Sequence, residues 1–306
     1  MKQANQFEGG AKNDFSMSSG RALKIFWMVC MALAVSGLIV MTFVKEFSFA
    51  QDFSKSYLLV AVLGVMAFIA EYVDSSIGMG YGTTLTPVLL IMGFTPLQIV
   101  PAILLSEFIS GTLAGGLHHK VGNVNLKRGT RANKIMIVLA LCSIIGTVIA
   151  VLLALSLPKH IVKLYIGLMI LAIGLFILVG QRLMSKFSWG KVIGLGTVAA
   201  FNKGISGGGY GPLVTGGQVM VGIPGKNAVG ITSLAEGLVC LVGLILYISL
   251  KGGLYWRLSI TLTVGALLSV PAAVWTVKVL PESMLKKSIG FATLFLGILT
   301  LIKVMI

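Results

Sequence analysis

The stretch IGMGYGTTLTPVLLIMGF, residues 77–94, places a cluster of glycines in the middle of an apolar run. A second stretch, SGGGYGPLVTGGQVMVGI at residues 206–223, repeats this pattern later in the chain. Glycine weakens a helix interior and readily adopts left-handed backbone conformations. Each cluster therefore predicts a break in a helix, followed by a new helix. We name residues 78–82 the first knot and residues 207–211 the second knot.

The two knots belong to an internal repeat. A shift of 129 positions aligns residues 78–107 with residues 207–236 without a gap, and nine of the thirty positions are identical. The identical pairs are Gly78/Gly207, Gly80/Gly209, Tyr81/Tyr210, Gly82/Gly211, Thr86/Thr215, Gly93/Gly222, Val100/Val229, Leu105/Leu234 and Glu107/Glu236. Because the matches concentrate on glycines and one apolar-flanked glutamate, we interpret them as a duplication.

The composition predicts an integral membrane protein. Of 306 residues, 57% are hydrophobic and 11% charged, and the mean hydropathy is +0.99, outside the range of soluble domains. Apolar runs approach or exceed the roughly 20 residues that a helix needs to cross a bilayer. These runs are residues 23–44, 135–157, 161–180, 258–277 and 285–306. The alternation typical of a membrane β-barrel is absent, so the predicted fold class is all-α.

Each repeat divides into the same five pieces: an apolar segment that ends at a knot, a short segment, and three longer helices. The predicted ranges are 57–77, 83–93, 96–118, 133–157 and 160–181 in repeat one, and 191–206, 212–222, 225–248, 255–279 and 283–306 in repeat two. A segment of about 11 residues covers about 16 Å as a helix, against a hydrocarbon core of about 30 Å. The short segments are therefore predicted to be re-entrant half-helices.

One membrane domain is expected, with a polar tail at residues 1–22, an extra transmembrane helix at 23–44, repeat one at 57–181 and repeat two at 191–306. If each knot forms the tip of a hairpin, each repeat crosses three times and the two repeats have inverted topology. The loop HHKVGNVNLKRGTRANK, placed in the cytoplasm, puts 16 of the 24 Lys and Arg residues inside and seven outside. This distribution obeys the positive-inside rule.

The orientation predicts a cytoplasmic N-terminus, an external C-terminus and a location in the plasma (inner) membrane. The net charge of +15 is explained by the basic loops, because no basic surface with interleaved aromatics is present. No nucleic-acid partner is expected. The lipid bilayer is the expected surrounding, and a homo-oligomer is compatible with the sequence.

The knots predict a binding site for a small anionic solute. A helix that begins at a knot has unpaired N–H groups and a partial positive charge at its N-terminus, and two such ends facing each other favour an anion. The expected binding residues are Gly80, Tyr81, Gly82, Thr83, Thr84, Lys203, Ser206, Gly208, Gly209, Tyr210 and Gly211. The alternative is that the knot glycines only allow close packing, as expected for GTLAG (111–115) and GKVIG (190–194).

Lys203 is the only basic residue that the predicted segments place deep in the membrane. A lysine there is costly unless it is paired or functional, and its charge favours an anionic solute. The alternative is a lysine that extends to the interface or forms a structural ion pair. Its repeat equivalent is Asp74, so the two are candidates for a pair that a bound anion separates.

Four of the nine acidic residues fall inside predicted membrane segments: Glu71, Asp74, Glu107 and Glu236. An intramembrane carboxylate is costly, and burial disfavours its charged form, which suits a proton carrier or a gate. Two alternatives remain. Neutral glutamic acids can bond one helix to another, and the carboxylates can be ligands of a proton-coupled cation transporter.

Neither a cofactor nor a metal site is predicted. Cys30, Cys142 and Cys240 are isolated, and His118, His119 and His160 lie at predicted helix ends, where anchoring or capping is expected. The string GISGG (204–208) matches the G-x-S-x-G form of a hydrolase, with Ser206 as nucleophile. Because no strand precedes it and no histidine follows it in the chain, we expect no catalytic residues and no enzyme. An intramembrane hydrolase that uses Ser206 is the alternative of another class.

At the knots, the motifs GMGYGTTLTP and GGGYGPLVT resemble the sulfite exporter TauE/SafE family, and the resemblance covers residues 58–304. Tyr81 and Tyr210 interrupt the glycines, Pro87 retains the first family proline, and Gly216 stands at the position of the second. The resemblance implies transport, chiefly export, of small sulfur-containing anions such as sulfite or organosulfonates, linked to protons. From the residues themselves, inverted repeats with broken helices predict a secondary transporter with alternating access. A structural membrane subunit is a further alternative.

Overall fold

The computed structural model describes Phe53, residues 56–158, residues 160–172 apart from 163, 167, 170 and 171, and residues 187–281. The predicted tail 1–22, the extra helix 23–44 and the last helix 283–306 lie outside the described residues, as does most of the segment 160–181. Every named element of the described part is a helix, which confirms the all-α prediction.

The described helices follow the predicted order with small changes at their ends. They are α3 (Tyr57–Ile77), α4 (Tyr81–Ile91), α5 (Pro96–Lys120), α6 (Arg131–Ser156), α8 (Trp189–Ser206), α9 (Tyr210–Met220), α10 (Gly225–Lys251) and α11 (Trp256–Val279). Five of them, α3, α5, α6, α10 and α11, are long and apolar enough to cross a membrane. The helices after the knots, α4 and α9, have 11 residues each and are too short to span.

Paired glycines produce both helix breaks. α3 ends at Gly78 and α8 ends at Gly207, each with a φ of 75° in the left-handed region. The N–H of each glycine donates to the carbonyl four residues earlier, at 2.6 Å to Asp74 O and at 2.8 Å to Lys203 O. A second positive-φ glycine, Gly80 or Gly209, then begins the next helix. Only glycine adopts these angles at little cost, so both breaks follow from the sequence.

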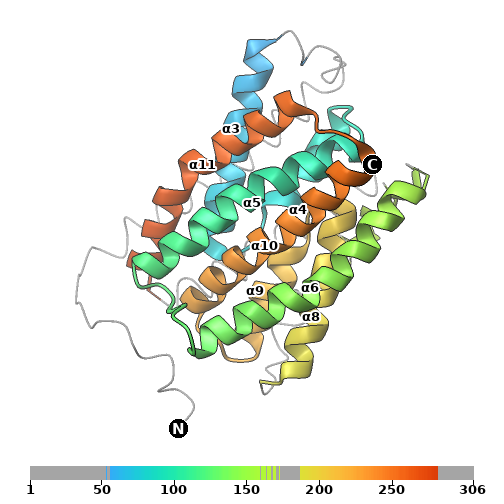
Figure 1. Ribbon diagram of the computed structural model, residues 1–306. Coiled ribbons are helices and arrows are strands. Elements are labelled where there is room, and N and C mark those ends of the chain that lie inside the picture. The colour runs from blue at the N-terminus through green and yellow to red at the C-terminus, as the bar shows by residue number, and fades with distance from the viewer. Residues whose placement is uncertain are drawn as a thin grey trace.

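The helices pack in the order α3, α11, α5, α10, α6, α8, and Figure 1 shows α11, α5, α10 and α6 running side by side. The shift of 129 residues relates α3 to α8, α5 to α10 and α6 to α11. If each helix is replaced by its repeat equivalent, the packing order becomes α8, α6, α10, α5, α11, α3, which is the original order reversed. The first helix of each repeat packs on a helix of the other repeat, α3 on α11 and α8 on α6. The repeats are thus interlocked.

Small residues bring the central helices together. A Cβ added at Gly115 of α5 would lie 2.6 Å from Leu234 Cβ of α10, so GTLAG is a packing motif as predicted. The prediction for GKVIG is wrong, because nothing lies within 4 Å of a Cβ added at Gly194. The contact between α6 and α8 instead uses Gly146, where an added Cβ would lie 2.4 Å from Thr197 O.

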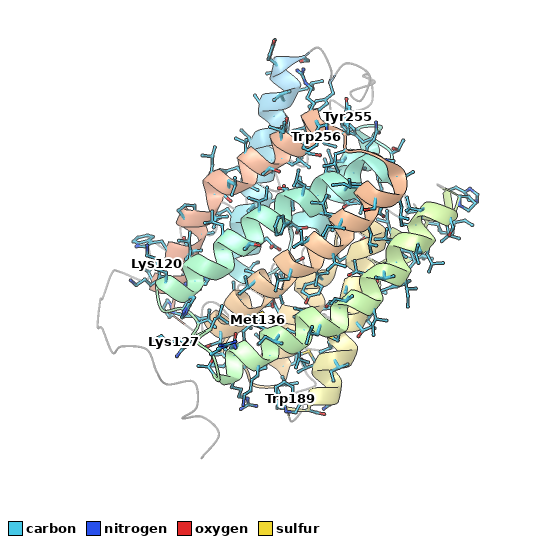
Figure 2. All side chains as sticks on the ribbon, in the orientation of Figure 1. Lys120, Lys127, Met136, Trp189, Tyr255 and Trp256 are labelled. Carbon is cyan, nitrogen blue, oxygen red and sulfur yellow. The ribbon has the colours of Figure 1, made fainter. Side chains whose placement is uncertain are left out.

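The outer faces carry large apolar side chains, including Leu141 and Ile145 on α6 and Leu268 on α11, which are at least 60% exposed. Such faces suit contact with lipid. Figure 2 shows Lys120, Lys127 and Trp189 toward one end of the bundle and Tyr255 and Trp256 toward the other. Tryptophan and tyrosine are typical of membrane interfaces.

Candidate functional site

The two knots are in direct contact, backbone to backbone. A Cβ added at Gly82 would lie 1.8 Å from Gly207 O, and one added at Gly211 would lie 2.5 Å from Gly78 O. These contacts are reciprocal, because Gly78 and Gly82 are the repeat equivalents of Gly207 and Gly211. The knot glycines therefore both break the helices and allow close approach, so the packing alternative accounts for part of their role.

Two threonines tie the knots together. Thr86 Oγ1 donates to Ser206 O at 2.8 Å, and Thr215 Oγ1 donates to Gly78 O at 2.8 Å. Both hydroxyls satisfy carbonyls that the helix breaks leave free. The sequence prediction did not include this pair in the site. Their identity across the repeats was the signal that could have identified them.

A side chain from the central helices holds each broken helix end. His118 Nε2 lies 3.0 Å from Ser75 O, and Tyr247 Oη donates to Gly204 O at 2.9 Å. Ser75 and His118 are the repeat equivalents of Gly204 and Tyr247, so the two bonds occupy equivalent places in the repeats. His118 Nδ1 accepts from Asn123 Nδ2 at 2.9 Å, so its Nε2 carries the hydrogen that Ser75 O accepts. His118 is fully buried, so interfacial anchoring is wrong for this residue, whereas its bond to a carbonyl of the last turn of α3 is a capping contact.

The buried Lys203 lies between the two repeat-equivalent glutamates. Its Nζ contacts Glu107 Oε2 and lies 2.8 Å from Glu236 Oε1. Lys203 is 1% exposed, and the glutamates are 3% and 5% exposed. The expected pair with Asp74 is not found among the ion pairs of the described residues. α5 and α10 pack along each other and both contact α8, and this packing brings both glutamates to the ammonium group instead.

Asp74 occupies the N-terminus of α4. The N–H of Tyr81, the first residue of that helix, points to Asp74 Oδ1 at 3.4 Å. A carboxylate therefore already stands at one of the two predicted anion positions. At the second knot the equivalent residue is Lys203, and the caps Gly80 and Gly209 of both short helices provide no side-chain acceptor.

Three carboxylates come together at this point. Oxygens of Asp74, Glu107 and Glu236 lie within 4.8 Å of one another, and the Lys203 ammonium contacts two of them. Carboxylate oxygens at such separations are able to share a metal cation or protons. The donor set is therefore compatible with a cation as well as with proton exchange, and the single lysine leaves an excess of acidic groups.

Glu71 lies beside this cluster on α3 and is 1% exposed. Ser75 Oγ donates to Glu71 Oε1 at 2.6 Å, while Glu71 Oε2 has no hydrogen-bond partner. The four acidic residues that the sequence singled out are thus all buried in one region, and Asp74 and Glu236 interact electrostatically with Glu71.

The predicted hydroxyl donors are engaged elsewhere. Tyr81 Oη bonds to Ser106 Oγ at 2.6 Å, and Tyr210 Oη lies 3.4 Å from Ser143 Oγ. Thr83 Oγ1 donates to Gly80 O at 3.2 Å, and Thr84 is half-buried. The groups left at the starts of the two short helices are therefore mainly backbone N–H groups, those of Tyr81, Gly82, Tyr210 and Gly211, and that of Tyr81 points to Asp74. Their binding of a solute, together with Gly208 and Gly209, stays a prediction.

Ser206 is a structural hydroxyl in this conformation. Its Oγ donates to Asn202 O at 2.7 Å and accepts from Gly208 N at 3.0 Å. The hydroxyl hydrogen is directed to a carbonyl rather than to a general base, which a hydrolase nucleophile needs.

The acidic cluster of Asp74, Glu107 and Glu236 is buried, and each of these residues is at most 8% exposed. A groove of about 420 Å³ along α5 and a small cavity beside α8 and α9 are lined by other residues.

Comparison with known proteins agrees with this architecture. The family described as Sulfite exporter TauE/SafE matches residues 63–300. The "Probable membrane transporter protein YtnM" of Bacillus subtilis (strain 168) is 25% identical over 255 residues, covering 79% of this chain and 82% of that protein.

A second relative is the "Probable membrane transporter protein ORF9" of Sinorhizobium sp, 34% identical over 118 residues, or 39% of this chain and 42% of that protein. No solved structure matches the chain. The family match covers more than half of the sequence and includes both knots, Lys203 and the three clustered carboxylates. The protein is a multi-helix membrane transporter that belongs to the Sulfite exporter TauE/SafE family.

Proposed function

We propose that the protein is a secondary transporter that carries a small oxyanion of sulfur, coupled to protons, by alternating access. The family description supports the substrate class, and the printed names of the relatives support transport. The repeats, interlocked through α3 with α11 and α8 with α6, are the elements that rock around the knots. The inverted topology of the two repeats is part of this proposal.

The observation that carries the proposal is the position of Lys203. Its ammonium group is buried in the last turn of α8, four residues before the cap Gly207, and it contacts Glu107 and Glu236. A cationic side chain near the N-termini of two short helices, one of which already attracts the Asp74 carboxylate, favours a bound anion. An anion that enters between the knots takes Lys203 from its carboxylates and replaces Asp74 at α4.

Charge balance links this step to protons. When Lys203 turns to the anion, Glu107 and Glu236 lose their counter-charge in a dry interior. An unpaired buried carboxylate is costly, so one of the glutamates takes up a proton as the anion binds. Anion and proton then occupy the same state of the carrier and cross the membrane in the same direction.

The direction of net transport follows from the two gradients. An inward proton gradient drives uptake, whereas a sufficiently high internal anion concentration drives export. The chiefly outward transport that the resemblance implies requires the second condition.

A cation carrier is the second candidate, because the oxygens of Asp74, Glu107 and Glu236 lie within 4.8 Å of one another. In that case Lys203 and the cation would compete for the same oxygens, and replacing Lys203 with Gln would strengthen cation binding. A hydrolase that uses Ser206 would lose all activity in Ser206→Ala, whereas an anion carrier would retain flux.

Flux in proteoliposomes tests the proposal. The vesicles contain a pH-sensitive dye and are given labelled sulfite, thiosulfate, sulfate or a sulfonate, with and without a proton gradient. We expect uptake of at least one sulfur oxyanion, acidification of the lumen during uptake, and loss of both in Lys203→Gln. The proposal is wrong if no anion moves under any gradient while a monovalent or divalent cation does.

A further inference from the structure

The polar groups around the central cluster are distributed unequally between the repeats. In repeat one, Glu71 and Ser75 of α3 and Ser110 of α5 form a buried polar trio. Their equivalents after the shift of 129 residues are Ala200, Gly204 and Val239. Repeat two therefore has no hydroxyl or carboxyl group at any of the three positions, although the backbone framework is shared.

The trio is connected along helix faces to the central carboxylates. Glu71 and Asp74 are three residues apart on α3, and Glu107 and Ser110 are three residues apart on α5, so each pair lies on one helix face. The Ser110 hydroxyl lies beside the Glu71 carboxylate. Asp74 and Glu236 interact electrostatically with the same Glu71 carboxylate. Glu71 thus adjoins the cluster from the repeat-one side.

The two oxygens of the Glu71 carboxyl group are held unequally. Ser75 Oγ donates to Glu71 Oε1 at 2.6 Å, whereas Ser110 Oγ and Glu71 Oε2 lie close enough to interact but do not complete a hydrogen bond of good geometry. A purely structural carboxylic acid would be expected to have both oxygens satisfied. A group that receives and passes a proton alternates between donor and acceptor, and needs a free oxygen for this.

From these observations, and resting on the proposed function, we infer that Glu71 is the residue that transfers protons to the central cluster, and that it does so from the repeat-one side only. The O–H bond at Glu71 breaks as a new one forms on an oxygen of Asp74 or Glu236, and Glu71 then regains a proton from solution when this side of the carrier opens. Repeat two, with Ala200 at the equivalent position, has no such step.

The groups that face Glu71 come from several helices. Asp74 on α3, Tyr81 on α4 and Glu236 on α10 interact electrostatically with Glu71. Lys203 on α8 and Glu107 on α5 belong to the adjoining cluster through Glu236. His118 reaches this region through its bond to Ser75 O, next to the serine that holds Glu71. Any pH effect has to be separated from titration of these groups, so the test compares two transport modes at one pH.

Exchange of labelled for unlabelled anion and proton-driven uptake separate the two roles. During exchange the cluster remains protonated, whereas net uptake requires the proton to enter and leave in each cycle. In Glu71→Gln proteoliposomes we expect thiosulfate exchange close to the wild-type rate and proton-driven uptake reduced about tenfold or more. Glu71→Asp, which retains a carboxyl group, should restore part of the proton-driven uptake.

Thr147→Val is the matched control. Thr147 is a fully buried residue of α6 whose hydroxyl has no hydrogen-bond partner, and it lies outside the acidic cluster. This variant should retain both exchange and proton-driven uptake, which shows that loss of a buried polar group is not sufficient for uncoupling.

The possible results have distinct meanings. If Glu71→Gln drives uptake with protons as the wild type does, the inference is wrong and the proposed function is unaffected. If a folded Glu71→Gln protein, verified by its thermal unfolding in detergent, loses exchange as well, Glu71 belongs to the anion site and the inference is again wrong. If the wild type moves no anion in either mode, the proposed function itself fails.

Discussion

At the scale of single residues, the molecule combines a symmetrical pair of glutamates with an asymmetrical pair at positions 74 and 203. Glu107 and Glu236 are repeat equivalents that contact the same lysine, whereas Asp74 and Lys203 are equivalents of opposite charge. A buried ion pair adds little net stability compared with apolar residues of similar size. The charges in this cluster therefore require a reason other than stability, and solute binding with proton exchange provides one.

Removing only the lysine should destabilise the protein strongly. Lys203→Met leaves Glu107 and Glu236 buried without their partner, and breaking such a pair costs about 3–5 kcal/mol. The triple variant Lys203→Met, Glu107→Gln, Glu236→Gln should regain most of this stability and still transport no anion. Thermal unfolding in detergent and thiosulfate exchange in proteoliposomes measure the two properties. Wild-type exchange by the triple variant would show that the cluster is only structural.

At the scale of the elements, each knot is a broken helix whose ends are held by the other half of the molecule. Thr86 and Thr215 bond across the knots, and His118 and Tyr247 hold equivalent carbonyls from α5 and α10. Because the knots touch through backbone atoms, they have no space for a side chain at the contact. Opening a path for a solute therefore requires the knots to separate.

Alanine substitutions should distinguish the contact from the rest of the short helices. Gly82→Ala places a Cβ 1.8 Å from Gly207 O, so we expect misfolding or complete loss of transport. Gly216→Ala, in α9, has nothing within 4 Å of the new Cβ and should change stability by less than about 1 kcal/mol, in the favourable direction. Expression, thermal unfolding and exchange measure both. Normal function of Gly82→Ala would contradict the knot contact.

Local chemistry explains which parts of this arrangement could be predicted from the sequence. Glycine clusters and apolar lengths determine helix ends within the chain, so the short α4 and α9 and the order of the described helices were predicted well. The partners of Lys203 were not predicted, because they depend on how α5 and α10 pack against α8. The exposed Gly194 and the buried His118 were misjudged for the same reason: neither helix rotation nor burial is encoded in a local motif.

At the scale of the whole molecule, replacing each helix by its repeat equivalent reverses the order of packed helices and leaves it otherwise unchanged. Such an arrangement places equivalent segments in equivalent surroundings, and the buried polar trio of Glu71, Ser75 and Ser110 in repeat one is a departure from it. Under the proposed mechanism, the two gates are similar in framework and different in chemistry. We propose that this difference couples transport to protons on one side.

If the two repeats have the proposed inverted topology, equivalent loops face opposite sides of the membrane. Lys127 lies in the loop after α5, and Gly253 lies in the loop after α10; both are exposed. In a background with the native cysteines replaced by alanine, we expect a membrane-impermeant maleimide to label Gly253→Cys in intact cells. Lys127→Cys should react only after the membrane is opened. Labelling of both positions from the same side would contradict inverted repeats.

The central claim is that the anion and a proton bind together at Lys203. Titration of the purified protein with thiosulfate in weakly buffered detergent solution, with bound anion and solution pH measured together, tests it most directly. We predict that about one proton is taken up per anion bound, by the charge balance of a dry site, and that Lys203→Gln binds neither. Anion binding with no proton uptake, or with proton release, would contradict the account.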